Sequence, residues 1–308
     1  MRDAIEFFFF EILHRFVHLF PFAQVQRMGS AFGQFAYSVL KIRKSLVMEN
    51  LTKAFPEKSI NEIERIAQGA YKNLFSTFFE ILYLDKITND EIQRIVQFPE
   101  PQRIHQLLQQ KKGLIILTGH FANWEFAAQS TACFVPEDYT VIVQKQRNKY
   151  IDRFMCRVRT RFGAKLVVME KAFRESFTAL KNNHIVALIA DQSGPEHGIF
   201  VDYFGRPTST HQGPAVFQVR TGAPMLLVML VRKGINNFHI ELEEIDLTGI
   251  SGTQDEMIVE ITRRHAAALE KFVRRYPEQW LWFHKRWKHT ESYLRRLEEE
   301  KKYEHNKS

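Results

Sequence analysis

The stretch Leu114-Ile-Ile-Leu-Thr-Gly-His-Phe-Ala-Asn-Trp-Glu125 decides the fold of this 308-residue chain. It opens with an apolar run of the length of a buried strand and then reaches Thr118-Gly119. Asn123, a favoured helix N-cap residue, follows and precedes a helical pattern. A strand, a turn and a helix in this order form the basic unit of an α/β domain.

The same alternation continues along the chain from Lys111 onward. It predicts an α/β fold with a central mixed, largely parallel sheet flanked by helices. Ser59 and Glu62 form a capping box that opens another helix, over 59–84. The expected strands are 113–118, 139–143, 165–169, 185–190, 225–231 and 238–242, and the other expected helices are 23–40, 123–133, 148–162, 171–182, 209–221 and 254–275.

The N-terminal segment, residues 4–20, carries four consecutive phenylalanines but is interrupted by charges. It is too short and too charged to be assigned as a spanning helix, so whether it spans the membrane or lies on it stays open, and it lacks the cleavage site of a signal peptide. Two interpretations stay open: a helix lying in the bilayer interface, which the Phe run favours, or a helix packed against the rest of the protein. On a helical wheel four polar residues share an arc of about 100°: Glu11, His14, Arg15 and His18.

The net charge and the cysteine content limit the possible partners and the cellular compartment of the protein. The net charge of +8 and the pI of about 9.4 suit an anionic partner, such as nucleic acid, anionic lipid, a phosphorylated substrate or an acidic carrier protein. The two cysteines, Cys133 and Cys156, lack metal-ligand spacing and form no disulfide framework. A reducing compartment is therefore expected.

His120 and Glu125 are the candidate catalytic pair. Residues five apart in a regular helix diverge by about 140°, so the two side chains can meet only if His120 precedes the helix. The sequence puts His120 there, at the carboxyl end of a strand, where α/β sheets place their sites. A His held by a carboxylate is a general base, and no Ser or Cys nucleophile stands beside it. The alternative is a structural His and a Glu that complements the helix dipole.

Basic residues crowd the stretch 145–165, which holds eight Lys or Arg and one acid. A helical wheel turns Arg159 towards the apolar face, where it could bind a phosphate or stabilise an oxyanion, and turns Arg157 outward. Asp191 follows another apolar strand and could hold Arg159. Asn123 and Arg157 are further candidates for contact with substrate, and the alternative for each arginine is a solvated basic face.

Aromatic residues near these positions are candidates for lining an apolar substrate pocket: Phe121, Trp124 and Phe204. Core packing is the alternative for each of them. Trp280, Trp282 and Trp287 stand among basic residues and suggest an interfacial belt, with a cation–π packing cluster as the alternative.

Several motifs together resemble a known family. Gly119-His120-x4-Glu125 is similar to the His-x4-acid motif of the glycerolipid acyltransferase superfamily. The Glu form resembles the branch of late, Kdo-dependent lipid A acyltransferases of Gram-negative bacteria. Further matching stretches, in the same order over residues 40–290, are Met48-Glu-Asn-Leu51, Phe55-Pro-Glu57, Asn148-x3-Asp152 with Arg159, Ala190-Asp-Gln192, Phe204-Gly-Arg-Pro207, Thr210-x2-Gly-Pro214, Arg220-Thr-Gly-Ala-Pro224, Pro277-Glu-Gln-Trp280 and Trp282-x-His284-x-Arg286.

The resemblance implies an O-acyltransferase with a glycerolipid-acyltransferase-like fold, in which His120 is the base, Glu125 its partner, and Arg159 and Asp191 further functional positions. In such an enzyme, the pocket lined by Phe121, Trp124 and Phe204 could hold the acyl chain. It implies acyl carrier protein or acyl-CoA as donor, a glycolipid acceptor such as a lipid A precursor, and no metal or other cofactor. We expect the enzyme to act on an anionic membrane surface, at the cytoplasmic face of the bacterial inner membrane. We expect no nucleic acid partner. The expected divisions are membrane-associated amphipathic helices over 1–45, an α/β acyltransferase domain over 46–295 and a charged tail over 296–308.

Rival functions remain open. Another glycolipid or a lysophospholipid could be the acceptor, because the sequence does not specify it. A metal-dependent hydrolase using His120, Glu125, Asp191 and His211 lacks ligand spacing, and acyl transfer, unlike such hydrolysis, should survive a chelator. A non-enzymatic basic module that binds membrane or nucleic acid predicts that His120→Ala leaves function intact.

Overall fold

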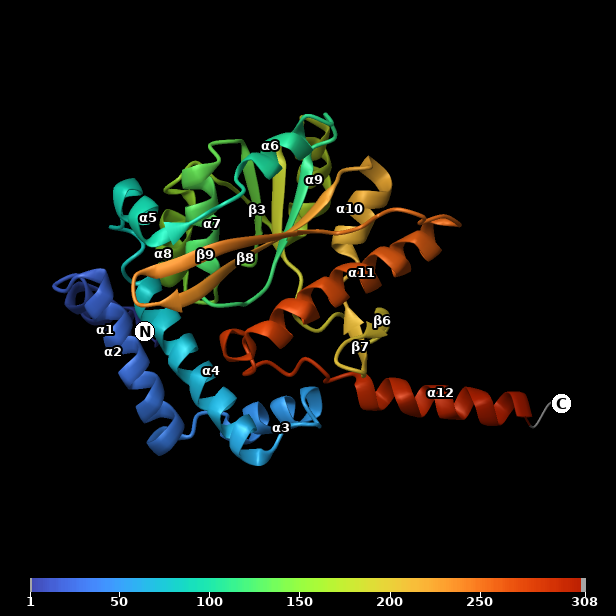
Figure 1. Ribbon diagram of the computed structural model, residues 1–308, viewed down its shortest axis with the longest axis horizontal. Helices are drawn as coiled ribbons and strands as arrows, with labels where there is room; N and C mark the ends of the chain where they lie inside the picture. Colours follow the sequence, from blue (N-terminus) through green and yellow to red (C-terminus); the bar gives the residue numbers. More distant parts are fainter. Residues whose placement is uncertain (1, 306–308) are drawn as a thin grey trace.

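The computed structural model describes residues 2–305, which form a seven-stranded sheet covered by helices on both faces (Figure 1). Five of the six strand pairings are parallel, and only β8 and β9 pair antiparallel. The predicted α/β fold with a mixed, largely parallel sheet is confirmed. In sheet order the strands are β1 (Val96–Gln97), β9 (Asn237–Glu244), β8 (Met225–Gly234), β2 (Leu114–Thr118), β5 (Ile185–Ile189), β3 (Tyr139–Val143) and β4 (Lys165–Val168).

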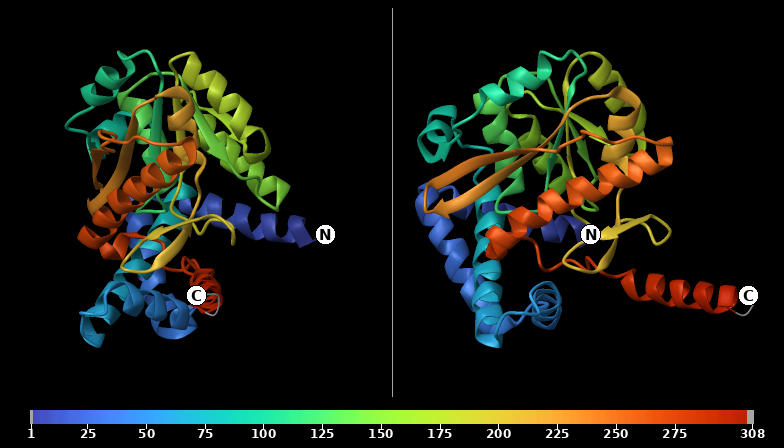
Figure 2. Two further views of the ribbon diagram at one scale, coloured as in Figure 1. Left: turned by 90° about the vertical axis from the view of Figure 1, so that its right-hand side faces the viewer. Right: turned by 45° about the vertical axis from the view of Figure 1, so that its right-hand side comes forward.

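The central strand β2 explains the two helical layers. Successive side chains of a strand point to opposite faces. Leu114 and Ile116 pack with helices α5 to α8, whereas Ile115 and Leu117 pack with α9 to α11. A strand that is buried on both faces needs an unbroken apolar sequence, as this one has. Figure 2 shows helices on both sides of the sheet: α5 (Asn89–Ile95), α6 (Gln102–Leu108), α7 (Trp124–Phe134), α8 (Lys149–Thr160), η2 (Met169–Lys171), α9 (Ala172–Lys181), α10 (Gly213–Thr221), α11 (Gln254–Arg275) and η3 (Pro277–Gln279).

The regions that differ from the sequence-based expectation include β1, α5 and α6, which were not predicted, and two further segments. The helix expected over 209–221 begins only at Gly213, with Pro214 in its first turn, because β6 (Ile199–Asp202) and β7 (Pro207–Thr210) pair as a separate hairpin. The expected charged tail over 296–308 continues, as far as it is described, as the exposed helix α12 (Thr290–His305), which projects from the domain (Figures 1 and 2). Residues 306–308 of that tail lie outside the described residues.

A helical layer from the N-terminal part of the chain packs below the sheet. Helix α2 lies close to α4 because of two glycines. A Cβ on Gly29 would lie 2.6 Å from the Cα of Ser76, and one on Gly33 would lie 2.5 Å from the carbonyl oxygen of Tyr71. The predicted capping box of α4 is present. The elements of this layer are α1 (Arg2–Val17), α2 (Phe22–Phe35), the π-helical turn η1 (Ala36–Leu40), α3 (Lys44–Ala54) and α4 (Ile60–Ile81).

The two histidines of the polar stripe face the protein, whereas Arg15 of that stripe and much of the apolar stripe of helix α1 are exposed. His14 and His18 are half-buried against Asp85, while Phe8 and Phe9 are 61% and 65% exposed. Most soluble helices show the opposite arrangement. An outward phenylalanine face of this kind marks an interaction surface.

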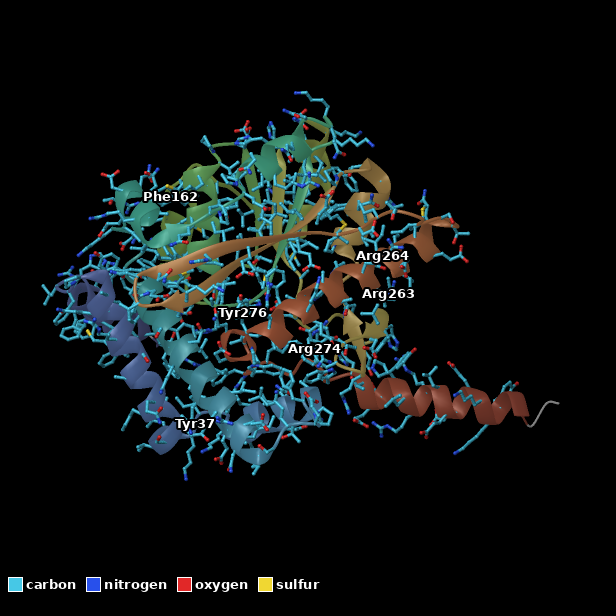
Figure 3. All side chains as sticks on the ribbon, viewed as in Figure 1. Tyr37, Phe162, Arg263, Arg264, Arg274 and Tyr276 are labelled. Carbon is cyan, nitrogen blue, oxygen red and sulfur yellow. The ribbon has the colours of Figure 1, made fainter. Side chains whose placement is uncertain are left out.

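The positive charge of helix α11 is largely neutralised within the helix. Arg263 and Arg264 both pair with Glu260, and Arg274 pairs with Glu270 (Figure 3). These i,i+3 and i,i+4 pairs leave little free charge on α11 for an anionic partner. The basic surface that is available for such a partner therefore has to come from other elements.

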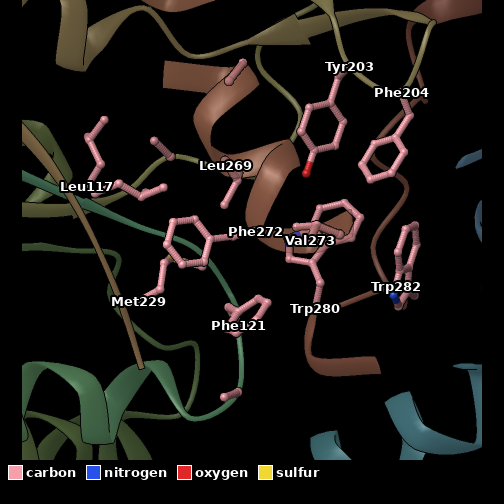
Figure 4. Packing of buried hydrophobic residues seen from close by; sticks show 14 of the residues in the cluster. Leu117, Phe121, Tyr203, Phe204, Met229, Leu269, Phe272, Val273, Trp280 and Trp282 are labelled. Carbon is pink, nitrogen blue, oxygen red and sulfur yellow. The ribbon is translucent and has the colours of Figure 1, made fainter. Parts of the chain in front are cut away.

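The three C-terminal tryptophans belong to the core, so the interfacial belt suggested by the sequence is wrong. Trp280 and Trp282 are 3% and 0% exposed and pack edge to face with each other, beside Tyr203 and Phe204 (Figure 4). Trp287 is also buried, with its ring next to Phe204. Their burial stabilises the segment that follows α11, and that segment reaches the site described next.

Candidate active site

His120 lies on the turn between β2 and α7, as the sequence predicted. The side chain of Asn123 accepts a hydrogen bond from the Phe126 backbone N–H at 2.9 Å and thereby caps α7. Glu125 falls in the first turn of α7. The backbone carbonyl of His120 accepts a hydrogen bond from the Leu281 N–H at 3.0 Å, which ties the turn to the segment after α11.

The carboxylate that holds His120 is Asp191 and not Glu125. His120 Nδ1 lies 2.7 Å from Asp191 Oδ1, and the His120 backbone N–H donates to Asp191 Oδ2 at 2.6 Å. Strands β2 and β5 are parallel neighbours, with Thr118 opposite Ile189, so the residues that follow their carboxyl ends meet. The predicted orientation of His120 by Glu125 is therefore corrected in favour of a partner from the adjacent strand.

Glu125 holds Arg159 instead, which corrects the expected pairing of Asp191 with Arg159. Arg159 Nε donates to Glu125 Oε2 at 2.8 Å and Nη2 donates to Oε1 at 2.6 Å. Both side chains are largely buried, so this two-bond pair is strong and fixed in direction. The helical wheel correctly turned Arg159 inward from α8, with Phe154 and Val158 buried on the same side.

The hydrogen bonds assign the roles of the two ring nitrogens of His120. With Asp191 accepting from Nδ1–H, the lone pair of the neutral ring is on Nε2. The side-chain amide of Gln192 lies 3.4 Å from Nε2 and can donate to it. In the described part of the chain, no Ser or Cys side chain hydrogen-bonds to His120. Nε2 is thus the atom available to accept a proton from a bound molecule.

The carboxylates favour the protonated form of His120. Burial of the ring opposes the positive charge, but the charge and hydrogen bond of Asp191 and the charge of Glu125 together raise the pKa of His120. Burial likewise opposes the charge of Asp191, but the charge of His120 and the hydrogen bonds from His120 and Trp280 hold the pKa of Asp191 below its usual value. Asp191 therefore stays ionised while His120 exchanges a proton.

Two residues that were not assigned individual roles from the sequence complete the surroundings of the pair. The Trp280 indole donates to Asp191 Oδ2 at 2.8 Å. Arg286 is 1% exposed and donates to the backbone carbonyls of Gln192 at 3.1 Å and Ser209 at 2.7 Å. Both stand in stretches that resemble the acyltransferase family, and that was the only signal in the sequence for them.

A buried charge network supports the turn from behind. Glu80 is fully buried, and its carboxylate accepts hydrogen bonds from Gln26 at 2.8 Å, from Asn123 at 2.9 Å and from both Nη atoms of Arg232. Thr77 donates to the carbonyl oxygen of Ala122 at 2.7 Å. Asn123 is 0% exposed and so supports the turn instead of facing a substrate, unlike the expected substrate contact.

Ala122 marks the strained position of this turn. Its φ is +42°, which L-residues with a side chain rarely adopt. Its N–H donates to the carbonyl oxygen of Gln279 at 2.7 Å. Strain of this kind persists only where surrounding contacts enforce it, and it is common at functional sites.

The remaining candidate residues from the sequence lie in three kinds of place: beside His120, in the core and on the surface. Trp124 meets the His120 ring edge to face, with centroids 5.0 Å apart. Phe121 and Phe204 are buried core residues: Phe121 packs near Tyr276, and Phe204 packs among Phe55 and the tryptophans. Arg157 is exposed and lies over the ring of Phe154. Of the three aromatic candidates for an acyl pocket, Trp124 is therefore the one in contact with the His120 ring.

The donor set considered for a metal-dependent hydrolase does not converge. Among the described residues, no three of His120, Glu125, Asp191 and His211 bring their ligand atoms together. Glu125 is engaged by Arg159, and Asp191 is engaged by the His120 ring. The arrangement suits proton transfer by an Asp–His pair.

The surface near the N-terminus carries a separate apolar feature. A groove of about 730 Å³ lies between α1, α2 and α4, lined by side chains that include Leu13, Phe16, Phe32, Phe35 and Phe78. None of the helices in residues 2–305 has both the length and the hydropathy to cross a bilayer.

The fold and the site together define an α/β protein with an Asp-held His at the carboxyl ends of two parallel strands. The sequence profile described as bacterial lipid A biosynthesis acyltransferase matches residues 2–289. The chain belongs to this family.

Individual relatives are distant. The lipid A biosynthesis palmitoleoyltransferase and the lipid A biosynthesis lauroyltransferase of Escherichia coli (strain K12) are each 23% identical over 270 residues, covering 87% of this chain and 86% of each relative. A phosphatidylinositol mannoside acyltransferase of Mycobacterium tuberculosis (strain ATCC 25618 / H37Rv) is 29% identical over 118 residues, 37% of each chain.

Proposed function

We propose that this protein transfers a fatty acyl chain from the thioester of acyl carrier protein, or of acyl-CoA, to a hydroxyl of a lipid A precursor. The observation that supports this most is the His120–Asp191 pair, which leaves Nε2 as a base without an adjacent enzyme nucleophile. A base placed in this way can activate an alcohol of the substrate directly, so no acyl-enzyme is needed.

The proposed reaction moves one proton and one acyl group. Nε2 of His120 takes the proton of the acceptor hydroxyl, and the oxygen attacks the thioester carbonyl. The resulting imidazolium is stabilised by Asp191, whose hydrogen bonds from Trp280 and from the His120 N–H keep it in place. The tetrahedral intermediate then expels the thiolate, which receives the proton from His120 and leaves as the thiol.

Arg159 is the proposed stabiliser of the negative oxygen in this intermediate. Its Nε and Nη2 are bound to Glu125, and among the described residues Nη1 has no hydrogen-bond partner. Glu125 thus orients the guanidinium, and its charge also contributes to the raised pKa of His120. A pre-oriented donor of this kind contributes more than a mobile one, because it need not reorganise during the reaction.

The outward phenylalanines of α1 support the proposal that the enzyme acts at a membrane surface. The exposed rings of Phe8, Phe9 and Phe16, together with the apolar groove, offer a face that fits the acyl region of a bilayer. Exposed basic residues of α8, among them Arg153 and Arg157, suit lipid headgroups or an acidic carrier protein. We place the protein at the cytoplasmic face of a bacterial inner membrane, in keeping with its family.

The acceptor is the part of the proposal with a specific rival. The matching relative from Mycobacterium tuberculosis is named for phosphatidylinositol mannoside, so another glycolipid is the second candidate. The same Asp–His chemistry serves any acceptor hydroxyl, and the acceptor is therefore decided by binding and not by the base.

The test is acyl transfer in detergent micelles with a matrix of donors and acceptors. Acyl carrier protein thioesters and acyl-CoA would each be offered to a lipid A precursor, a phosphatidylinositol mannoside and a lysophospholipid, with mass spectrometry of the products. We expect one added acyl chain on the lipid A precursor. Exclusive acylation of another acceptor would move the proposal to that lipid, and thioester hydrolysis without transfer to any acceptor would contradict it.

A further inference from the structure

A cluster of ligand-type side chains lies outside the active site, where α1 meets the end of α4 (Figure 1). Among the described residues it is the group of His, Cys, Asp or Glu side chains that converges closely enough to hold a metal ion. Its members are His14 from α1, His18 from the turn directly after α1 and Asp85 from the turn after α4, with their ligand atoms all within 4.8 Å of one another.

We propose that His14, His18 and Asp85 bind a divalent transition-metal ion of the zinc class, which fastens α1 to the catalytic domain. Residues at i and i+4 share one face of a helix, so both imidazoles approach Asp85 from the same side. Two imidazoles and a carboxylate suit zinc and its neighbours, whereas magnesium and calcium prefer oxygen ligands.

The distances fit such an ion. His14 Nε2 and His18 Nε2 each lie 3.0 Å from a carboxylate oxygen of Asp85. Zn–N and Zn–O bonds of about 2.0–2.1 Å in a tetrahedron separate neighbouring ligand atoms by roughly 3.3 Å. Small side-chain movements would therefore open the cluster around an ion. The backbone carbonyl of Leu82, 3.0 Å from His18 Nε2, borders the same position.

The other nitrogen of His14 supports metal binding over a simple hydrogen bond. His14 Nδ1 is buried without a hydrogen-bond partner, and the closest acid is Glu11, with Oε2 3.8 Å away. If His14 donates from Nε2 to Asp85 as a neutral ring, its unprotonated Nδ1 faces the Glu11 carboxylate. A nitrogen lone pair that faces a negative charge is unfavourable. With a metal on Nε2, Nδ1 carries the proton and directs it towards the Glu11 carboxylate. Metal-bound histidines commonly direct their second ring N–H to an outer carboxylate in this way.

A metal at this position would have a defined structural effect. Helix α1 holds its Phe face outward, and α4 carries the Thr77 and Glu80 contacts of the catalytic turn. The ion would thus join the proposed membrane-facing helix to the helix that supports the active site.

The test is cobalt binding to the full-length protein, purified without a polyhistidine tag and stripped of metal. Co²⁺ gives visible d–d absorption when bound in a tetrahedral site. We expect one saturable equivalent, displaced by Zn²⁺, in the wild type. We also expect it in His105→Ala, a control that removes an exposed His paired with Glu137. Cobalt binding is measured without acyl transfer, so the absence of a cobalt signal would not contradict the proposed function.

Two variants make the result decisive. His14→Ala/His18→Ala should abolish the signal, with circular dichroism used to confirm folding. Asp85→Asn should weaken binding by more than the roughly 10- to 100-fold that loss of an outer-shell partner costs. The proposal is wrong if the wild type shows no saturable cobalt signal or if the signal persists in the folded double variant. If that variant does not fold, unchanged affinity in Asp85→Asn overturns the proposal.

Discussion

At the scale of single residues, the properties of His120 depend on two carboxylates with different tasks. Asp191 contacts the ring and fixes the position of its proton, whereas Glu125 acts on the ring only through its charge while it holds Arg159. Substitution of Asp191 and substitution of Glu125 should therefore affect the acyl-transfer reaction in different ways.

Asp191→Asn should change the pH dependence of transfer. The reaction needs neutral His120, so kcat/KM should rise with pH through the pKa of His120, which lies above the ordinary value of about 6.5 in the wild type. Loss of the Asp191 charge lowers that pKa, so the rising limb should move to lower pH. The plateau should fall by roughly 10²- to 10⁴-fold. A pH–rate profile measures both effects, and an unmoved limb would show that Asp191 does not act on His120.

Arg159→Lys tests the proposed stabilisation of the intermediate. Lysine keeps the charge but cannot make two parallel bonds to Glu125 and still offer a donor. We expect kcat to fall by about 10²- to 10³-fold, with a smaller change in KM. Arg157→Lys, an exposed change on the same helix, is the matched control and should leave kcat near that of the wild type. Equal kcat values for the two variants would remove Arg159 from the mechanism.

At the scale of secondary-structure elements, the sequence predicted local structure well and partnerships poorly. The periodicity predicted the principal strands and the helix α11 with its bounds, because these signals lie within one segment. The pairing of His120 with Asp191 depends on β2 and β5 being neighbours, and segment patterns do not encode strand order. The tryptophans were misassigned because basic neighbours in sequence suggested an interface, while the fold buries all three rings.

Helix α4 supports the turn that carries His120 through Glu80, and the loss of this contact should lower the free energy of unfolding measurably. Glu80→Ala leaves the guanidinium of Arg232 and the amide of Asn123 without their buried carboxylate. We expect the free energy of unfolding to fall by about 3–5 kcal/mol. Glu49→Ala, which breaks the exposed pair with Lys53, should cost less than about 1 kcal/mol. Chemical denaturation compares the two, and similar costs would contradict a supporting role for Glu80.

At the scale of the whole molecule, helix α1 lies away from α9 (Figure 1). The exposed phenylalanines of α1 and the apolar groove beside it are therefore on a different part of the surface from α9. The double substitution Phe8→Ser/Phe9→Ser should weaken binding to vesicles of anionic phospholipid by roughly tenfold or more, because two exposed rings lose their burial in the bilayer. Phe173→Ser, a half-exposed ring on α9, is the control. Vesicle sedimentation gives the partition coefficients, and equal loss in both variants would contradict a membrane face on α1.

The sequence could not decide between the two interpretations of α1, because an amphipathic helix has the same pattern whichever way it faces. The fold shows which way the helix faces. Asp85 holds the histidine stripe inward, and the contact of Phe10 with Phe154 fixes the helix on α8. The phenylalanines outside these contacts are then left on the surface.

The central claim is that His120 removes the proton from the acceptor hydroxyl. The most direct measurement is the rate of acyl transfer to the accepted lipid by His120→Ala beside the wild type, at saturating donor and acceptor. We expect a loss of roughly 10²- to 10⁴-fold in kcat, with folding and vesicle binding unchanged. A His120→Ala protein that still transfers acyl chains at the wild-type rate would contradict it.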